Sequence, residues 1–157
     1  MQWEAKPENL YGVDLLQERI NVANNISPNI NFLCGNAESI AFNDKFFDII
    51  TQFTCFTSIL DPEMKKNIAK EMMRLLKDDG IILWYDFRYN NPKNNDVKGI
   101  KKAEIKDLFP NCSYDFNLIT LAPPIARKLA LVSYLSCYLL SKIPILKTHY
   151  LIIIKKI

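Results

Sequence analysis

The chain of 157 residues can bury a hydrophobic core, and its 49% hydrophobic and 24% charged content is ordinary for one globular domain. A net charge of +3 with dispersed lysines argues against nucleic acid as a partner. The four cysteines form no C-x-x-C pair and the single histidine, His149, stands apart from them. We therefore expect no metal site and a reducing, cytoplasmic setting.

Strands and helices alternate through the first two thirds of the chain. Residues 9–15 ("NLYGVDL") read as a short strand, and a helix follows from about Leu16 to Asn25 because its apolar residues recur on one face. The next two strands are expected at "INFLCGN" (30–36) and "KFFDIITQF" (45–53), which are rich in β-branched and aromatic residues.

The sequence around Asp61 predicts the start of a second helix. A capping Asp followed by proline at the first helical position favours a helix start there. The outer face of this helix is expected to carry Lys65, Lys66, Lys70 and Arg74. The segment "KDDG" (77–80) is then expected to turn the chain into a strongly apolar strand, "IILWYDF" (81–87).

A polar, asparagine-rich loop at 88–99 is long enough to be functional. After it we expect a helix near 101–108, a strand near 114–120, an apolar helix from about Pro124 and a final strand at 148–156. The alternation predicts one α/β domain over 1–157, with a doubly wound, mostly parallel sheet and a hairpin formed by its last two strands.

The apolar helix near the end of the chain is expected to be mostly buried. The uncharged run between Lys128 and Lys142 is shorter than the roughly 20 residues that a bilayer requires, so we predict no transmembrane segment. Attachment to a membrane surface through a partly exposed apolar face is the weaker alternative.

Three strand ends carry groups suited to a nucleotide-like ligand, which binds beyond the carboxyl ends of the strands in doubly wound folds. Asp14 could accept hydrogen bonds from ribose hydroxyls, and Asn36 with the backbone of Ala37 could meet an adenine edge. Gln52, Phe53 and Thr54 end the following strand, where a backbone carbonyl or an aromatic edge could meet the cofactor. Each position alone is explained as well by a helix cap or a turn, but the series favours a cofactor site.

The order of these segments resembles the class I S-adenosylmethionine-dependent methyltransferases. "YGVDL" matches the acidic end of the family's second strand, "CGNAESIAF" its adenine loop, "FDIITQFTCFTSILD" its fourth strand and "LLKDDGIILWYDF" its fifth. "LAPPIARKLA" and "KTHYLIIIKK" resemble the tail of a bacterial subgroup with a "WYDF…NP" segment, which is associated with glycan gene clusters. The resemblance implies a Rossmann-like fold and S-adenosylmethionine as cofactor.

The resemblance also implies roles for individual residues. Asp14 would hold the ribose hydroxyls and Leu15 would pack on the adenosine. Asn36 and Ala37 would meet the adenine, and Gln52 with Phe53 would line the methionine side. The family's first strand and its G-x-G-x-G loop have no counterpart before Asp14. The chain thus looks like a methyltransferase whose first strand is missing or atypical. We expect it to bind the cofactor poorly or not at all by itself, to be marginally stable, and to self-associate as a homodimer or aggregate.

Catalysis asks little of such a protein, because the methyl sulfonium is already activated and the acceptor mainly needs alignment. Tyr85, Asp86 and Arg88 lie at or beyond the end of the fifth strand, where the resemblance places a small-molecule or glycan acceptor. Asp86 could be a general base for a hydroxyl acceptor, and equally a turn residue or a partner of Arg88. His149 begins the last strand and is expected to lie away from this edge, in a structural role.

Two other functions stay open on the sequence alone. A degenerate, non-catalytic relative could act as a binding or scaffolding domain, since the glycine loop is absent from the sequence. A nucleotide-dependent dehydrogenase would use Asp14 equally well, although the "GNAE" loop and the "FDII" strand start argue against it. An in-frame "GxGxG" in upstream coding sequence would favour the enzyme over the scaffold, and a fluorescence titration with NADH tests the dehydrogenase.

Overall fold

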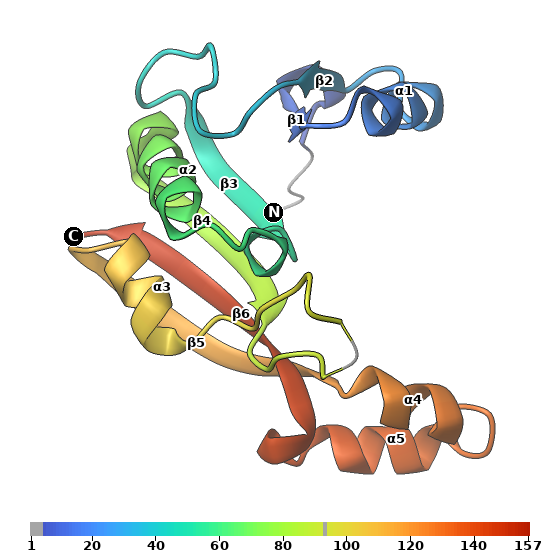
Figure 1. Cartoon of the computed structure of the whole chain (residues 1–157). Coiled ribbons are helices and arrows are strands. Elements are labelled where there is room, and N and C mark those ends of the chain that lie inside the picture. The colour runs from blue at the N-terminus through green and yellow to red at the C-terminus, as the bar shows by residue number, and fades with distance from the viewer. Residues whose placement is uncertain (1–4, 93) are drawn as a thin grey trace. The chain divides into compact units, whose positions relative to one another are not determined.

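The computed structural model describes residues 5–92 and 94–157. The chain divides into two compact units, Met1–Phe42 and Asn43–Ile157. Each unit has its own β-sheet, two-stranded in the first unit and four-stranded in the second (Figure 1).

The first unit is a strand–helix–strand arrangement, as predicted. The strands β1 (Tyr11–Asp14) and β2 (Asn31–Cys34) pair in parallel, and α1 (Gln17–Ile26) connects them. A short 3-10 helix, η1 (Pro7–Asn9), precedes β1. Gly12 of β1 lies against the ring of Phe32 of β2, where a Cβ would stand 2.7 Å from ring carbon Cδ1. A side chain at this position would therefore require the Phe32 ring to move.

The sheet of the second unit is mixed, with the strand order β3-β4-β6-β5. Its strands are β3 (Phe47–Phe53), β4 (Leu76–Phe87), β5 (Cys112–Leu121) and β6 (Lys147–Lys156). β3 and β4 are parallel, whereas β6 runs antiparallel to both of its neighbours, β4 and β5. The predicted α/β architecture is confirmed, and the expected closing hairpin is formed by β5 and β6.

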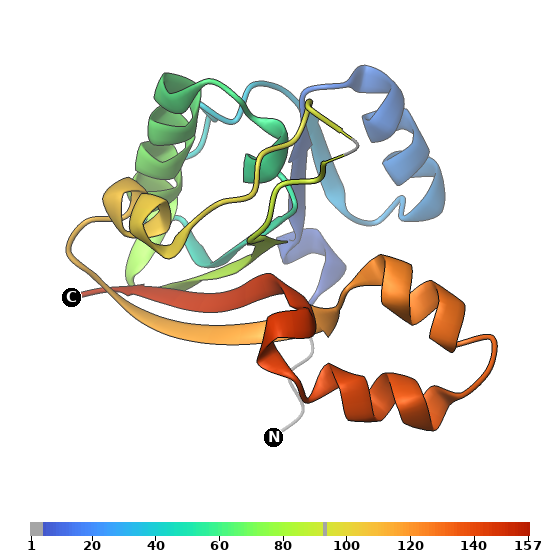
Figure 2. The same cartoon turned by 60° about the horizontal axis from the view of Figure 1, so that its bottom comes forward.

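Two helices cover one face of this sheet, α2 (Pro62–Leu75) and α3 (Lys102–Leu108) (Figures 1 and 2). As predicted, Asp61 caps α2, since its carboxylate accepts a hydrogen bond of 2.9 Å from the backbone N–H of Glu63. Such caps typically stabilise a helix by about 1 kcal/mol. The covered face of β4 carries fully buried side chains, among them Ile82 and Trp84.

The aromatic core below these helices is centred on Trp84. Its indole ring lies 4.5 Å from the ring of Phe56 and 5.8 Å from the ring of Phe109, measured between centroids. Phe56 belongs to the 3-10 helix η2 (Phe56–Ser58) after β3, and Phe109 follows α3. The core therefore joins the loop after β3 to the middle of β4.

Lys65 and the segment 77–80 depart from expectation. Lys65 was expected on the outer face of α2, but it is only 4% exposed because α3 packs beside it and Glu104 pairs with its ammonium group at 2.7 Å. Residues 77–80 were expected to form a turn but belong to β4, as an irregularity between the pairs Phe47–Leu76 and Ile49–Ile81. β4 thus continues through residues that by themselves favour a turn, although the register gives 77–80 no partner in β3 or β6.

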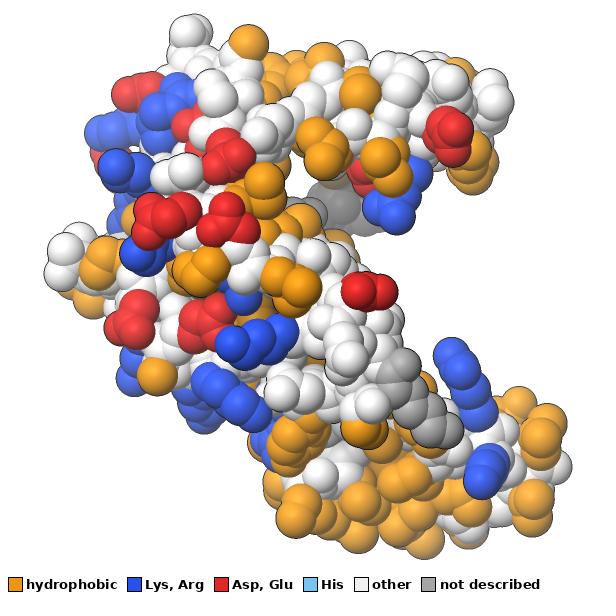
Figure 3. Space-filling view, in the orientation of Figure 1, with side chains coloured by type: hydrophobic (Ala, Val, Ile, Leu, Met, Phe, Trp, Pro, Cys, Tyr) orange, Lys and Arg blue, Asp and Glu red, His pale blue; other side chains and the backbone are white. Residues whose placement is uncertain are grey.

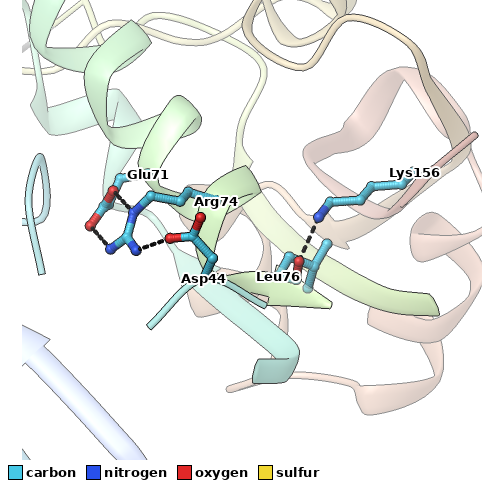
Figure 4. Close-up of polar contacts among 5 residues, drawn as sticks. All are labelled: Asp44, Glu71, Arg74, Leu76 and Lys156. Carbon is cyan, nitrogen blue, oxygen red and sulfur yellow. Dashed lines mark hydrogen bonds and ion pairs between the residues drawn. The ribbon is translucent and has the colours of Figure 1, made fainter. Parts of the chain in front are cut away.

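Polar contacts hold the C-terminal end of α2 and the C-terminal end of β6 (Figure 4). Arg74 donates to both carboxylate oxygens of Glu71, at 2.8 and 2.7 Å, and to Asp44 at 2.6 Å. The ammonium group of Lys156 donates to the backbone carbonyl of Leu76. These contacts tie the last turn of α2 to the segment before β3, and the last residues of β6 to the first of β4.

The apolar segment before β6 is a helical hairpin and not one buried helix. It consists of α4 (Pro123–Leu129), α5 (Tyr134–Ser141) and the 3-10 helix η3 (Pro144–Leu146). Every residue of α4 and α5 is at least partly exposed, so the expectation of a mostly buried helix is wrong. Within residues 5–92 and 94–157, no helix is long and apolar enough to cross a membrane.

Candidate functional site

The carboxyl ends of β3 and β4 lie side by side in the second unit. Gln52 pairs with Trp84, and Phe53 pairs with Tyr85. Because β6 is antiparallel to β4, its first residues lie at this same edge, with His149 opposite Phe87. The expectation that His149 lies away from the edge is therefore wrong.

Asp86 is 0% exposed and faces the covered side of the sheet. Its carboxylate accepts hydrogen bonds from the backbone N–H groups of Thr57, at 3.2 Å, and Phe87, at 2.8 Å. Burial raises the pKa of Asp86. The hydrogen bonds that its carboxylate accepts from Thr57, Phe87 and Gln52 lower this pKa and oppose the rise only partly. Asp86 thus fixes the η2 loop onto β4, and among the described residues no ion pair joins it to Arg88.

Tyr85 lies on the opposite face of β4 from Asp86, because successive side chains of a strand alternate in direction. Its hydroxyl forms a 2.9 Å hydrogen bond with the hydroxyl of Thr120. Its ring stacks on His149, with 4.6 Å between centroids and 5° between planes, and lies 6.0 Å from the ring of Phe53. The structure therefore separates Tyr85 from Asp86 and joins it to Phe53.

His149 completes an aromatic cluster, which we define as Phe53, Tyr85, Phe87 and His149. The His149 ring lies 3.9 Å from the ring of Phe87 between centroids, and its Nδ1 lies 3.0 Å from the hydroxyl of Thr148. Burial lowers the pKa of His149, so the imidazole is neutral at pH 7. Phe53 is the exposed member of the cluster and gives it a surface at the edge of the sheet.

The end of β3 holds a strained turn. Thr54 has φ of +53°, a conformation that is unusual for a β-branched residue, and its N–H donates to the carbonyl of Tyr85 at 2.8 Å. Gln52 is buried, and its Oε1 accepts from the N–H of Cys55 at 3.2 Å. Backbone strain of this kind is frequent where a protein meets a ligand.

Arg88 follows β4 and is directed into the asparagine-rich loop. Its guanidinium group lies 4.3 Å from the ring centroid of Tyr89 and bonds to the Tyr89 hydroxyl. The loop is held closed where the side chain of Asn90 accepts from the N–H of Gly99 at 3.0 Å, and where Lys98 N–H donates to the Thr57 carbonyl at 2.8 Å. The loop thus has defined hydrogen bonds over its first and last residues.

An open hollow of about 390 Å³ lies against this loop. Its lining is mostly amide side chains and comprises Leu60, Asn90, Asn91, Asn94, Asn95, Val97 and Lys98. Amide groups both donate and accept hydrogen bonds, so such a lining suits a polar molecule that carries several hydroxyl groups.

The remaining predicted cofactor residues lie in the first unit, at the carboxyl ends of β1 and β2. Asp14 accepts from the N–H of Leu16 at 2.9 Å and pairs with Arg19 at 3.4 Å. The N–H of Gly35 donates to the Asp14 carbonyl at 3.0 Å and joins the two strand ends. A carboxylate can accept about four hydrogen bonds, so these contacts leave acceptor positions for ribose hydroxyls.

Asn36 and its neighbour Ala37 begin the loop after β2. The Asn36 side chain accepts from the N–H of Glu38 at 3.0 Å and donates to the Glu38 carboxylate at 2.8 Å. Leu15 is largely exposed beside Asp14, and Ala37 is half-buried. The structure thus gathers Asp14, Leu15, Asn36 and Ala37 at one end of the first unit, and their roles toward a cofactor stay predictions.

Thr54 lies at the end of its strand as predicted, but the backbone strain of this residue is visible only in three dimensions. The position of His149 at the candidate site was missed. The predicted closing hairpin could have indicated this position. Its last strand, β6, pairs antiparallel with β4, so the start of β6 lies at the candidate site.

Comparison with known families decides the identity of this α/β arrangement. A family model described as a methyltransferase domain matches residues 1–84, which is more than half of the chain. The chain belongs to this methyltransferase domain family. The predicted class I family is thereby confirmed, together with S-adenosylmethionine as the cofactor that the family uses.

Individual relatives agree with this assignment. The chain is 34% identical over 64 residues to the ubiquinone/menaquinone biosynthesis C-methyltransferase UbiE of Vibrio campbellii, a match that covers 41% of this chain and 24% of that protein. It is 31% identical over 83 residues to phthiotriol/phenolphthiotriol dimycocerosates methyltransferase 1 of Mycobacterium ulcerans, covering 53% of this chain and 28% of that protein. The chain thus matches only about a quarter of the length of these relatives.

The fold is similar to those of solved methyltransferases. The structure of a SAM-dependent methyltransferase from Methanosarcina mazei superposes with a TM-score of 0.64 at 18% identity, covering 94% of this chain and 82% of that one. At this identity the likeness establishes the Rossmann-like fold alone.

Proposed function

We propose that this protein transfers the methyl group of S-adenosylmethionine to a small-molecule acceptor. The observation that carries the proposal is the family match over residues 1–84, because this segment contains all the predicted cofactor-binding positions. The protein supplies alignment, while the sulfonium group of the cofactor supplies the reactive methyl. The exposed Cys34 thiol forms no disulfide, which favours a reducing compartment, and we propose a cytoplasmic location.

We propose cofactor-binding roles for the predicted residues of each unit, considered separately. Asp14 accepts the ribose hydroxyls, Leu15 packs on the adenosine, and Asn36 with the backbone of Ala37 meets the adenine. The free acceptor positions of Asp14 and the exposed side chain of Leu15 support these roles. Gln52 and Phe53 line the methionine side, for which the exposed Phe53 ring at the end of β3 is suited.

We propose a hydroxyl-rich acceptor, such as a glycan, in the hollow of the asparagine-rich loop. Its amide lining and Lys98 support a polar acceptor. Arg88 would position the acceptor from the beginning of that loop, and Tyr85 would contribute through the aromatic cluster. The burial of Asp86 and its two backbone hydrogen bonds favour a positioning role for this carboxylate over that of general base.

We further propose that two copies of the chain pair along β3. Within the described residues, β3 has a strand partner on one side only, which is β4. An open strand edge readily pairs with another chain.

The cofactor proposal is tested by calorimetric titration of the purified chain with S-adenosylhomocysteine. Asp14→Ala should weaken binding at least tenfold, about 1.4 kcal/mol, because the variant lacks the charged acceptor for the ribose hydroxyls. Asp14→Asn keeps an acceptor for the N–H of Leu16 and should also lose affinity, which separates ligand binding from helix capping.

Glu18→Ala is the matched control, since it removes an exposed carboxylate from the first turn of α1. It should bind like the parent chain. Equal affinities for the parent and Asp14→Ala would remove Asp14 from the site. A parent chain that binds NADH and not S-adenosylhomocysteine would contradict the methyltransferase proposal.

A further inference from the structure

The α4–α5 hairpin exposes an apolar surface that its own unit does not cover. At the turn between the two helices, Leu131 is 88% exposed and Val132 is 84% exposed. Tyr134, at the start of α5, is 81% exposed, and Leu135, Tyr138 and Leu139 are also exposed. In Figure 3, hydrophobic side chains cover most of the visible surface of this hairpin. A soluble surface rarely keeps such a contiguous apolar patch unless it contacts something else.

The charges around the patch all have the same sign. From Phe116 to Ile157 the sequence contains no Asp or Glu. Arg127 and Lys128 end α4, and Lys142 follows α5, with its ammonium nitrogen 4.5 Å from the ring centroid of Tyr138. Lys and Arg side chains stand beside the apolar surface in Figure 3. The complementary partner is therefore apolar at its centre and anionic at its rim.

The dimensions of the hairpin fit a membrane surface. α5 has 8 residues, and at 1.5 Å per residue it is about 12 Å long, which is less than half of the roughly 30 Å hydrocarbon core. Side chains at the turn can enter the acyl region while flanking cations remain among the phosphates and tyrosines occupy the interface. A second copy is a poorer partner, because a two-fold contact of this patch would bring the same cations together.

We propose that the α4–α5 hairpin docks onto the surface of an anionic lipid bilayer. Leu131 and Val132 enter the acyl boundary, and Arg127, Lys128 and Lys142 bind lipid phosphates. The hairpin rests on the surface and does not span it. This inference does not depend on methyl transfer, since the surface is complete without a cofactor.

The test is flotation of the purified full chain with two kinds of vesicle, without S-adenosylmethionine. The chain should float with vesicles of mixed phosphatidylcholine and phosphatidylglycerol, and much less with phosphatidylcholine alone. High salt should weaken the association because it screens the lysine and arginine charges. The double variant Leu131→Ser, Val132→Ser should lose flotation, and Arg127→Gln, Lys128→Gln should lower the partition coefficient by roughly fivefold for each cation removed.

The matched control is Ile26→Ser, which removes an equally exposed apolar side chain, 75% exposed, at the end of α1. It should float like the parent chain, and circular dichroism melting should show every variant folded. The proposal fails if the parent chain does not float with anionic vesicles, or if the Leu131 and Val132 variant floats as well as the parent. It also fails if the Leu131 and Val132 substitutions convert a dimer to a monomer and neither the dimer nor the monomer floats with vesicles.

Discussion

The buried carboxylate of Asp86 acts at the candidate site by binding backbone N–H groups. Asp86 holds the N–H of Thr57 and so fixes the loop that follows β3, next to Gln52 and the strained Thr54. Without that carboxylate the buried N–H would lack a partner, which typically costs about 1–3 kcal/mol. A strand-end aspartate can therefore shape a site without touching the reacting atoms.

His149 should make the stability of the protein depend on pH. Burial lowers its pKa in the folded state, whereas the unfolded chain takes up a proton near pH 6.5. The unfolded state therefore binds more protons as the pH falls below about 6.5, and the free energy of unfolding should decrease there. Denaturant titrations at pH 7.5 and 5.5 should show this loss in the parent chain.

His149→Phe retains an aromatic ring between Tyr85 and Phe87 and removes the titrating group. The difference in unfolding free energy between the two pH values should shrink in this variant. An unchanged pH dependence would show that other groups cause it.

At the scale of elements, the asparagine-rich loop depends on one glycine. A Cβ at Gly99 would stand 2.4 Å from the carbonyl carbon of Tyr89. This carbon belongs to the main chain, which has less freedom to move than a side chain. Gly99→Ala should therefore lower the free energy of unfolding by about 1–3 kcal/mol and disturb the hollow. Chemical denaturation measures the loss.

Gly35→Ala is the matched control, because no atom lies within 4 Å of a Cβ built there. It should leave the stability nearly unchanged. Equal stabilities of the two variants would mean that the loop can shift away from Tyr89 without cost.

At the scale of the whole molecule, the open edge of β3 predicts self-association. Ile49 on this strand is 54% exposed, and an exposed apolar edge favours strand pairing between chains. Sedimentation velocity should therefore show a dimer that grows with concentration. Ile49→Lys should shift the protein toward the monomer, because a charged side chain disfavours pairing at an edge.

Val22→Lys is the control for this prediction, since it places the same charge at an exposed apolar position of α1. It should leave the association unchanged. A parent chain that stays monomeric at all concentrations, or an equally strong dimer of Ile49→Lys, would rule out pairing along β3.

The sequence by itself determined the order of the elements and the family. Some features depend only on residues close together in the sequence, so they can be predicted from the sequence alone. They include the hydrophobic periodicity, the Asp61 cap and the strand-end residues Asp14 and Asn36. The strand, helix and loop boundaries derived from them agree with the structure over most of the chain. The same strand ends placed the candidate cofactor residues at the carboxyl ends of β1, β2 and β3.

Only the tertiary structure decided which faces and edges these residues share. The antiparallel insertion of β6 brought His149 to the edge of Tyr85, and strand alternation put Asp86 on the opposite face. Packing of α3 buried Lys65, and strand pairs with β3 on either side of residues 77–80 made these residues part of β4. The apolar segment folded into an exposed hairpin. Each outcome depends on which distant segment lies alongside, and the free energy of that contact outweighs the local preference that the sequence pattern reports.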